Sequence, residues 1–161
     1  MTNWPEWDAA WALARIRELE HLPGALLPTL HALQDDFGYI DPCVIPVIAQ
    51  QLNLSEAEVH GVITFYHDFR TSPPGRHVLR VCRAEACQSM GCDHLIAHVE
   101  QRTGVKLGTT AGDHSLTFEP VYCLGNCALS PSIMLDGTLY GRVTPAVADA
   151  LLDETAAGDR L

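Results

Sequence analysis

Residues 73–87 read PPGRHVLRVCRAEAC, and this stretch sets the organisation of the chain on both sides of it. The two prolines and the glycine favour a turn between two differently patterned halves. The run HVLRVC at 77–82 alternates in the manner of a β-strand. Cys82 closes that run and Cys87 follows it, so the stretch joins a predicted domain boundary, a strand and a pair of thiols.

The residues that follow predict a mixed domain. A helical period ends at Gly104, an apolar strand pattern runs up to Cys123, and Asp136–Gly137 is a dipeptide typical of hairpin turns. The predicted elements after the first strand are a helix at 92–104, a strand at 116–123, two short strands within 132–143 and a helix at 144–154. Their order, β, α, β, β, β, α, indicates an α/β or α+β domain over residues 76–161.

The residues that precede it predict a small helical bundle over residues 1–72. Apolar side chains recur with helical period, Pro46 suits a first helical turn, and Ser55 followed by Glu58 is a capping-box pattern. The predicted helices cover 6–22, 28–36, a segment that starts near Pro46, and 55–69. The segment TSPPG at 71–75 is the predicted boundary between the two domains.

Composition excludes several classes of function. The 161 residues are 47% hydrophobic, as in an ordinary globular protein, and no apolar stretch reaches the length of a membrane span. Ten basic residues stand against twenty acidic ones, a formal charge of −10, which argues against nucleic-acid binding. No secretion signal is recognisable at the N-terminus, so we expect a cytoplasmic protein whose cysteines stay reduced or bind metal.

A second cysteine pair, Cys123 and Cys127, occurs in the run YCLGNC. Each pair follows a predicted strand, so we expect both pairs on loops at the ends of neighbouring strands. Two close pairs of thiolates supply two ligands to each iron of a [2Fe–2S] cluster. Gly125 would let the backbone turn with positive φ or approach such a cluster. The sequence therefore predicts an iron–sulfur site on Cys82, Cys87, Cys123 and Cys127.

Structural zinc is the main alternative, because four cysteines can also form a tetrahedral zinc site. The spacing disfavours zinc, since neither pair is C-x-x-C, and it disfavours a dithiol redox pair for the same reason. Cys92 is interpreted as a bystander and Cys43 as a small buried residue. His94 and His98 are four residues apart on a predicted helix but lack the glutamate of a zinc hydrolase motif, so a surface or half-buried face is expected.

No phosphate loop, nucleophile elbow or paired-carboxylate pattern is recognisable, so we expect electron transfer without catalysis by the chain alone. Over nearly its whole length the chain resembles the thioredoxin-like [2Fe–2S] ferredoxin family, which includes the 24 kDa subunit of respiratory complex I. The resemblance rests on LPTLHALQDDFGYI, VHGVITFYHDF, PPGRHVLRVC and CLGNCALSP. It implies a thioredoxin-like fold for 76–161, with Cys82, Cys87, Cys123 and Cys127 as cluster ligands.

Within that family, VCRAEACQSMG and EPVYCLGNCALSPSIMLDGTLYGRVTP look most like the gamma subunit of soluble NAD-dependent formate dehydrogenases. This implies docking on a flavoprotein that holds FMN and NAD, and through it on a molybdopterin-containing catalytic subunit. The equivalent subunits of complex I and of NAD-reducing hydrogenases are alternatives, as is a zinc-stabilised adaptor. We expect residues 1–72 to dock on the partner, with Trp4, Trp7 and Trp11 either at that interface or in the core of their own domain.

Overall fold

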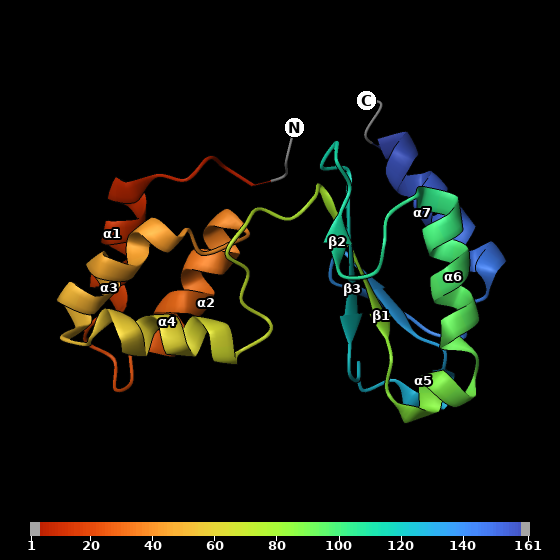
Figure 1. Cartoon of the computed structure of the whole chain (residues 1–161), viewed down its shortest axis with the longest axis horizontal. Helices are drawn as coiled ribbons and strands as arrows, with labels where there is room; N and C mark the ends of the chain where they lie inside the picture. Colours follow the sequence, from red (N-terminus) through yellow and green to blue (C-terminus); the bar gives the residue numbers. More distant parts are fainter. Residues whose placement is uncertain (1–3, 159–161) are drawn as a thin grey trace. The chain divides into compact units, whose positions relative to one another are not determined.

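The computed structural model describes residues 4–158 of the chain and divides it into two compact units (Figure 1). One unit runs up to Pro74 and the other begins at Gly75. Each of the two units has its own hydrophobic core. Among the described residues, no helix combines the length and the apolar character that crossing a membrane would require.

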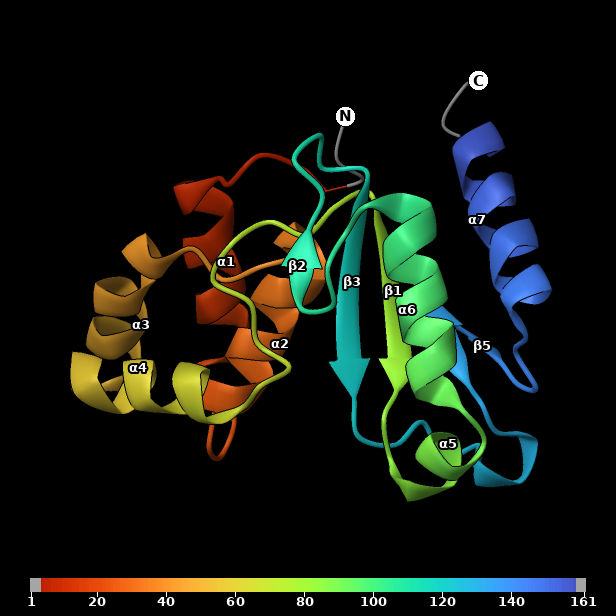
Figure 2. The ribbon, with the colours of Figure 1, turned by 45° about the vertical axis from the view of Figure 1, so that its right-hand side comes forward.

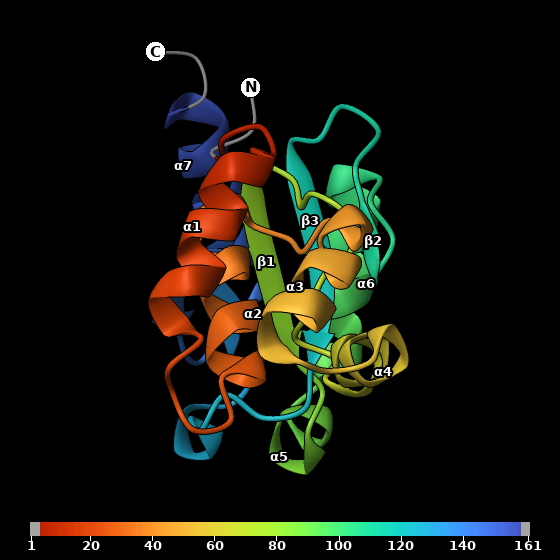
Figure 3. The same ribbon diagram turned by 90° about the vertical axis from the view of Figure 1, so that its left-hand side faces the viewer.

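The first unit is helical (Figure 3). Asp8 begins the first helix by accepting hydrogen bonds from the backbone N–H groups of Ala10 and Trp11. The predicted capping box of Ser55 and Glu58 is confirmed, with both reciprocal hydrogen bonds present. The elements are α1 (Ala9–Leu19), α2 (Leu26–Phe37), the 3₁₀ turn η1 (Pro42–Val44), α3 (Ile45–Leu52) and α4 (Glu56–Phe65). The last helix ends earlier than predicted because Tyr66 has extended backbone.

Phe37 is at the centre of the helical unit and is fully buried. Its ring lies 4.5 Å from that of Trp7 and 5.0 Å from that of Trp11, centroid to centroid. These two tryptophans therefore pack on the core of their own unit, which is the second of the two sequence alternatives. The other buried apolar residues of this core are Ala12, Ile16, Leu30, Leu33, Ile40, Val44, Ile48, Ala49, Val59, Ile63 and Phe69.

The second unit is a five-stranded sheet with helices. Its elements are β1 (His77–Cys82), α5 (Glu85–Ser89), α6 (Cys92–Thr103), β2 (Thr109–Thr110), β3 (Leu116–Val121), the 3₁₀ turn η2 (Cys127–Leu129), β4 (Ile133–Leu135), β5 (Thr138–Tyr140) and α7 (Pro145–Gly158). The sequence predicted β1, α6, β3, β4, β5 and α7 but neither α5 nor β2. Both are too short for hydrophobic periodicity to reveal them.

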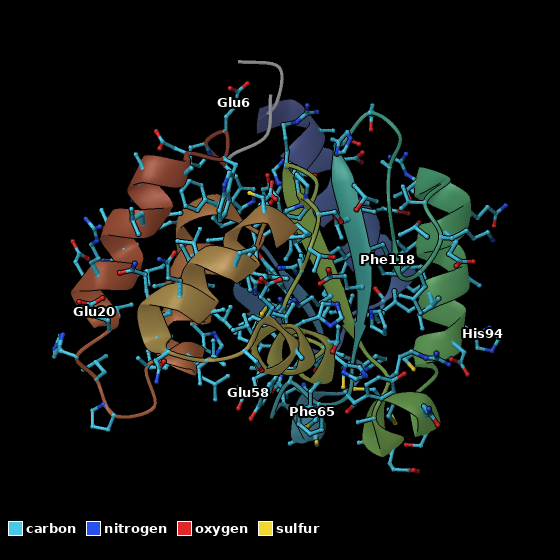
Figure 4. The ribbon with its side chains drawn as sticks, turned by 60° about the vertical axis from the view of Figure 1, so that its left-hand side comes forward. Glu6, Glu20, Glu58, Phe65, His94 and Phe118 are labelled. Carbon is cyan, nitrogen blue, oxygen red and sulfur yellow. The ribbon has the colours of Figure 1, made fainter. Side chains whose placement is uncertain are left out.

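The strands are ordered β2-β3-β1-β4-β5, with β1 and β3 parallel and every other pair antiparallel. The predicted hairpin turn is confirmed, since Asp136 and Gly137 both have positive φ, at 49° and 82°. Helices α6 and α7 lie side by side against one face of the sheet (Figures 1 and 2). Phe118 of β3, labelled in Figure 4, is fully buried in the resulting core.

Candidate metal centre

The four candidate cysteines gather at the carboxyl ends of the two parallel strands. Cys82 is the last residue of β1 and is in register with Val121, the last residue of β3. Just beyond the strand, the N–H of Arg83 donates to the carbonyl of Val121 at 2.8 Å. Both chain segments therefore leave the same edge of the sheet, and Figure 2 shows the arrowheads of β1 and β3 on the side where α5 lies.

The first pair is held by regular structure, which corrects the prediction that both pairs lie on loops. Cys82 belongs to β1 and Cys87 to the short helix α5. Each of the two side chains is only 2% exposed. They are part of the apolar core of this unit, so their positions are fixed by packing as well as by the backbone.

The second pair lies on irregular backbone and is exposed. Cys123 has a φ of 135°, a conformation that costs a residue with a side chain about 1–3 kcal/mol and clusters at functional sites. Cys127 begins the 3₁₀ turn η2, and its Sγ lies 3.9 Å from that of Cys123. Gly125 has a φ of 72°, which confirms the expected turn, and its N–H donates to the Sγ of Cys123 at 3.3 Å.

Ser130 connects the two pairs. Its Oγ lies 3.5 Å from the Sγ of Cys87 and donates to the backbone carbonyl of Cys127 at 2.8 Å. A second connection runs from the backbone N–H of Leu124, which forms a hydrogen bond with the Cys82 thiol. The two predicted pairs are thus linked by hydrogen-bond contacts at one end of the sheet.

The environment of the first pair acts on its two thiols in opposite directions. Burial raises the pKa of Cys82, although the N–H groups of Ala84 and Leu124 favour the thiolate. Burial alone would also raise the pKa of Cys87. Hydrogen bonds with Ser130, Cys82 and the backbone of Ser132 outweigh burial there, and the pKa of Cys87 is lowered.

In the second pair, the hydrogen bond with Cys123 raises the pKa of Cys127, and the charge of Cys123 adds to the effect. Burial and the charge of Cys87 in the first pair raise the pKa of Cys127 further. Several thiolates so close together repel one another, and a bound cation would remove that repulsion.

The loop that carries Cys127 packs closely against the backbone of Gly141. A Cβ added to Gly141 would lie 2.6 Å from the Cβ of Leu129 and 2.7 Å from the side-chain nitrogen of Asn126. That nitrogen donates to the Oγ of Ser132 at 3.2 Å. Only glycine allows this close approach of the loop to the backbone after β5.

The donor set fits a [2Fe–2S] cluster: four thiols arrive in two pairs, and backbone N–H groups donate to the sulfurs of Cys123 and Cys82. Within residues 4–158, no three side chains of His, Cys, Asp or Glu gather closely enough to hold a single metal ion. The four cysteines near this end of the sheet supply the number of thiolates that the two irons of such a cluster need.

The remaining cysteines lie outside this set, and none of the six is in a disulfide. Cys92 is fully buried in the core, and burial raises the pKa of its thiol, with smaller contributions from the charges of Asp93, Cys87 and Cys82. Cys43 corrects the sequence interpretation, because it is exposed rather than buried. It lies on η1, where the buried position is taken by the next residue, Val44.

The two histidines on α6 behave as expected for a surface or half-buried face. His94, labelled in Figure 4, is exposed, whereas the Nε2 of His98 lies 2.8 Å from a carboxylate oxygen of Asp149 on α7. Ser130 and Leu124 are the site residues that the sequence did not indicate. Only their place within the second cysteine loop could have drawn attention to them, since hydrogen bonds to sulfur have no sequence pattern.

Comparison with known proteins gives a consistent result. A family model described as thioredoxin-like [2Fe–2S] ferredoxin matches residues 12–156 of the chain. One subunit of the NADH-quinone oxidoreductase of Pseudomonas aeruginosa is 34% identical over 129 residues, which cover 80% of this chain and 78% of that subunit. The corresponding subunit of the Escherichia coli K12 oxidoreductase is 32% identical over 151 residues, 92% of this chain and 91% of that subunit.

The HndA subunit of the NADP-reducing hydrogenase of Solidesulfovibrio fructosivorans is 31% identical over 142 residues, covering 86% of this chain and 83% of that subunit. Among solved structures, a chain of an air-oxidised NAD⁺-reducing [NiFe]-hydrogenase superposes with a TM-score of 0.71 at 22% identity. The match covers 83% of this chain but only 23% of the hydrogenase chain, and it shows a shared fold.

Proposed function

This chain belongs to the thioredoxin-like [2Fe–2S] ferredoxin family, and we propose that it is an electron-transfer subunit that holds one [2Fe–2S] cluster on Cys82, Cys87, Cys123 and Cys127. The observation that carries the proposal is the meeting of two cysteine pairs at the ends of adjacent parallel strands, joined through Ser130.

One-electron oxidation and reduction is the chemistry that such a cluster supplies when bound. The residues of the chain would bind and position it. Cys82 and Cys87 provide thiolates from a rigid, water-excluded core, while Cys123 and Cys127 provide the exposed pair. The N–H of Gly125 donates to the sulfur of Cys123, and donors of this kind raise the reduction potential of a cluster by stabilising negative charge.

The proposed setting is a soluble complex in which this subunit docks on a flavoprotein that holds FMN and NAD. The support is that the curated relatives are subunits of NADH-quinone oxidoreductases and of a hydrogenase. The helical unit, residues 1–72, is proposed as the part that grips the partner. We propose further that the complex is a formate dehydrogenase with molybdopterin in another subunit. The support is the amino-acid sequence of the segments around both cysteine pairs.

This proposal is tested by tagging the full-length chain in the organism that produces it, purifying it anaerobically and analysing what co-purifies. We expect flavin to co-purify, together with NAD⁺ reduction that depends on formate. Activity with hydrogen or with a quinone in place of formate would overturn the formate assignment and support the electron-transfer role. A chain that co-purifies with no flavin and supports none of the three reactions would overturn the role itself.

A further inference from the structure

Two aromatic side chains stand exposed where α4 ends. The side chain of Phe65 is 74% exposed and that of Tyr66 is 43% exposed. Their rings meet edge to face at 5.2 Å, and the ring of Tyr66 lies 6.1 Å from that of Phe69, which is buried in the core of the helical unit. A phenylalanine this exposed is costly in water, and aromatic residues of this kind are enriched at the centres of interfaces.

The pair is held in place before any partner arrives. The N–H of Tyr66 donates to the carbonyl of Val62 at 3.1 Å, and the N–H of Phe69 donates to the carbonyl of Tyr66 at 3.1 Å. A ring nitrogen of His67 lies 3.1 Å from the carbonyl of Phe65. A surface that is already ordered loses little conformational entropy on binding, which favours its use as an anchor.

Gly61 lies one helical turn before Phe65, and the packing of the described residues does not require a glycine there. Its φ is not in the left-handed region, and a Cβ built on it would meet no atom within 4 Å among the described residues. A glycine within a helix costs about 1 kcal/mol relative to alanine. Because the fold gives no return for this cost, the absence of a side chain at Gly61 points to a neighbour outside the chain. Ala57 is exposed one helical turn before Gly61, so two small residues follow each other on the same face of α4.

Charge identifies the kind of neighbour. Residues 18–69 contain eight Asp and Glu residues and no Lys or Arg. Glu56 and Glu58, at the start of α4, and Asp68, three residues after its end, are exposed, and Figure 4 labels Glu58 and Phe65. Arg70, the first basic residue afterwards, is half-buried and its N–H donates to Gln34. An exposed aromatic pair on an acidic segment is complementary to an apolar pocket on a basic surface.

We propose that Ala57, Gly61, Phe65 and Tyr66 form the docking surface of the helical unit, and that its occupant is a partner subunit with an apolar pocket ringed by Lys and Arg. The proposal rests on the docking role given to residues 1–72 and names the residues that perform it. It replaces the tryptophans in that role, because Trp7 and Trp11 pack on Phe37 of their own core.

Matched variants of the full-length chain test the surface. Phe65→Ala and Gly61→Leu should each reduce the flavin-containing subunit recovered with the tagged chain by about tenfold or more. Gly61→Leu is the more informative variant, because leucine is a better helix former than glycine. The thermal unfolding temperature should stay the same or rise, while docking is lost. Trp11→Ala, which removes an aromatic residue that is 45% exposed on α1, should leave recovery unchanged.

Unchanged recovery with both Phe65→Ala and Gly61→Leu would overturn the proposal, and so would a loss confined to Trp11→Ala. A photo-crosslinking phenylalanine analogue at position 65 tests the partner. A crosslink to a peptide rich in Lys and Arg supports the proposal, and a crosslink to a second copy of this chain overturns it. The visible spectrum and iron content of the variants should match those of the wild type, so a failed docking surface is distinguishable from a failed electron-transfer role.

Discussion

The two cysteine pairs lie at the same end of one sheet but differ in how the chain holds them. Cys82 and Cys87 are each 2% exposed and belong to β1 and α5. Cys123 and Cys127 are exposed, on irregular backbone that includes a residue with a φ of 135°. The difference teaches that one half of the site is set by folding, whereas the other is a surface loop shaped by a few hydrogen bonds.

The largest expected effect is the loss of iron, and it should be the same for a ligand of either pair. Cys82→Ser and Cys123→Ser should each reduce the iron content from about two atoms per chain to a small fraction, because a [2Fe–2S] cluster needs all four ligands. Cys43→Ser, which changes an exposed thiol of the helical unit, is the control and should keep its iron. Iron analysis and the visible spectrum measure the result. Full iron in Cys123→Ser would remove that residue from the ligand set.

The rate of thiol labelling should distinguish the buried pair from the exposed pair. In the iron-free chain we expect iodoacetamide to modify Cys123 and Cys127 about tenfold or more faster than Cys82 and Cys87, which react only after local opening. Mass spectrometry of the digested chain gives the rates. In the iron-loaded chain the labelling of Cys123 and Cys127 should stop, while Cys43 continues to react. Equal rates for all four cysteines in the iron-free chain would contradict the difference in burial.

The stability of the iron-free chain should show the same asymmetry. Cys82→Ser places a hydroxyl in an apolar core and should lower the free energy of unfolding of the second unit by about 1–3 kcal/mol. Cys123→Ser changes an exposed side chain and should alter that free energy by no more than about 0.5 kcal/mol. Urea unfolding followed by circular dichroism measures both. A larger loss for Cys123→Ser would mean that the exposed loop is part of the folding core.

Two glycines provide the finest comparison. Gly125 and Gly104 have nearly the same φ, 72° and 73°, and a Cβ on either would meet no described atom within 4 Å. Alanine at either position should therefore cost about 1 kcal/mol of stability. Only Gly125→Ala should also speed the loss of iron to a chelator, because a side chain at this positive φ strains the turn and shifts the backbone N–H that donates to the sulfur of Cys123. Equal rates of iron loss in the two variants would show that the position of this N–H does not affect how the iron is held.

Sequence patterns indicated the parts of the fold with strong periodicity or specific turn chemistry. The strand at 77–82, the helix that begins at Cys92, the Ser55–Glu58 capping box and the Asp136–Gly137 hairpin all occur as predicted. The helix α5 was missed because its five residues span little more than one turn. Consequently Cys87 was placed on a loop, although it lies in that helix.

The exposure of individual residues was harder to predict than their secondary structure. Cys43 is exposed because a 3₁₀ turn takes up DPCV, a segment too short to show which side chain points inward. The role of Ser130 depends on contacts with Cys87 and Cys127 that only the folded chain brings together. Phe65 is an apolar residue in a helical pattern, and it is exposed because it lies two residues after the buried Ile63, on the opposite face of α4.

The most direct test of the central claim is a combined spectrum and metal analysis of the anaerobically purified wild-type chain, oxidised and then reduced with dithionite. We predict a red-brown protein with about two irons and two sulfides per chain and an EPR signal that develops on reduction. A colourless, EPR-silent chain that holds zinc, and that takes up no iron and sulfide on reconstitution, would contradict the account and leave the zinc-stabilised adaptor.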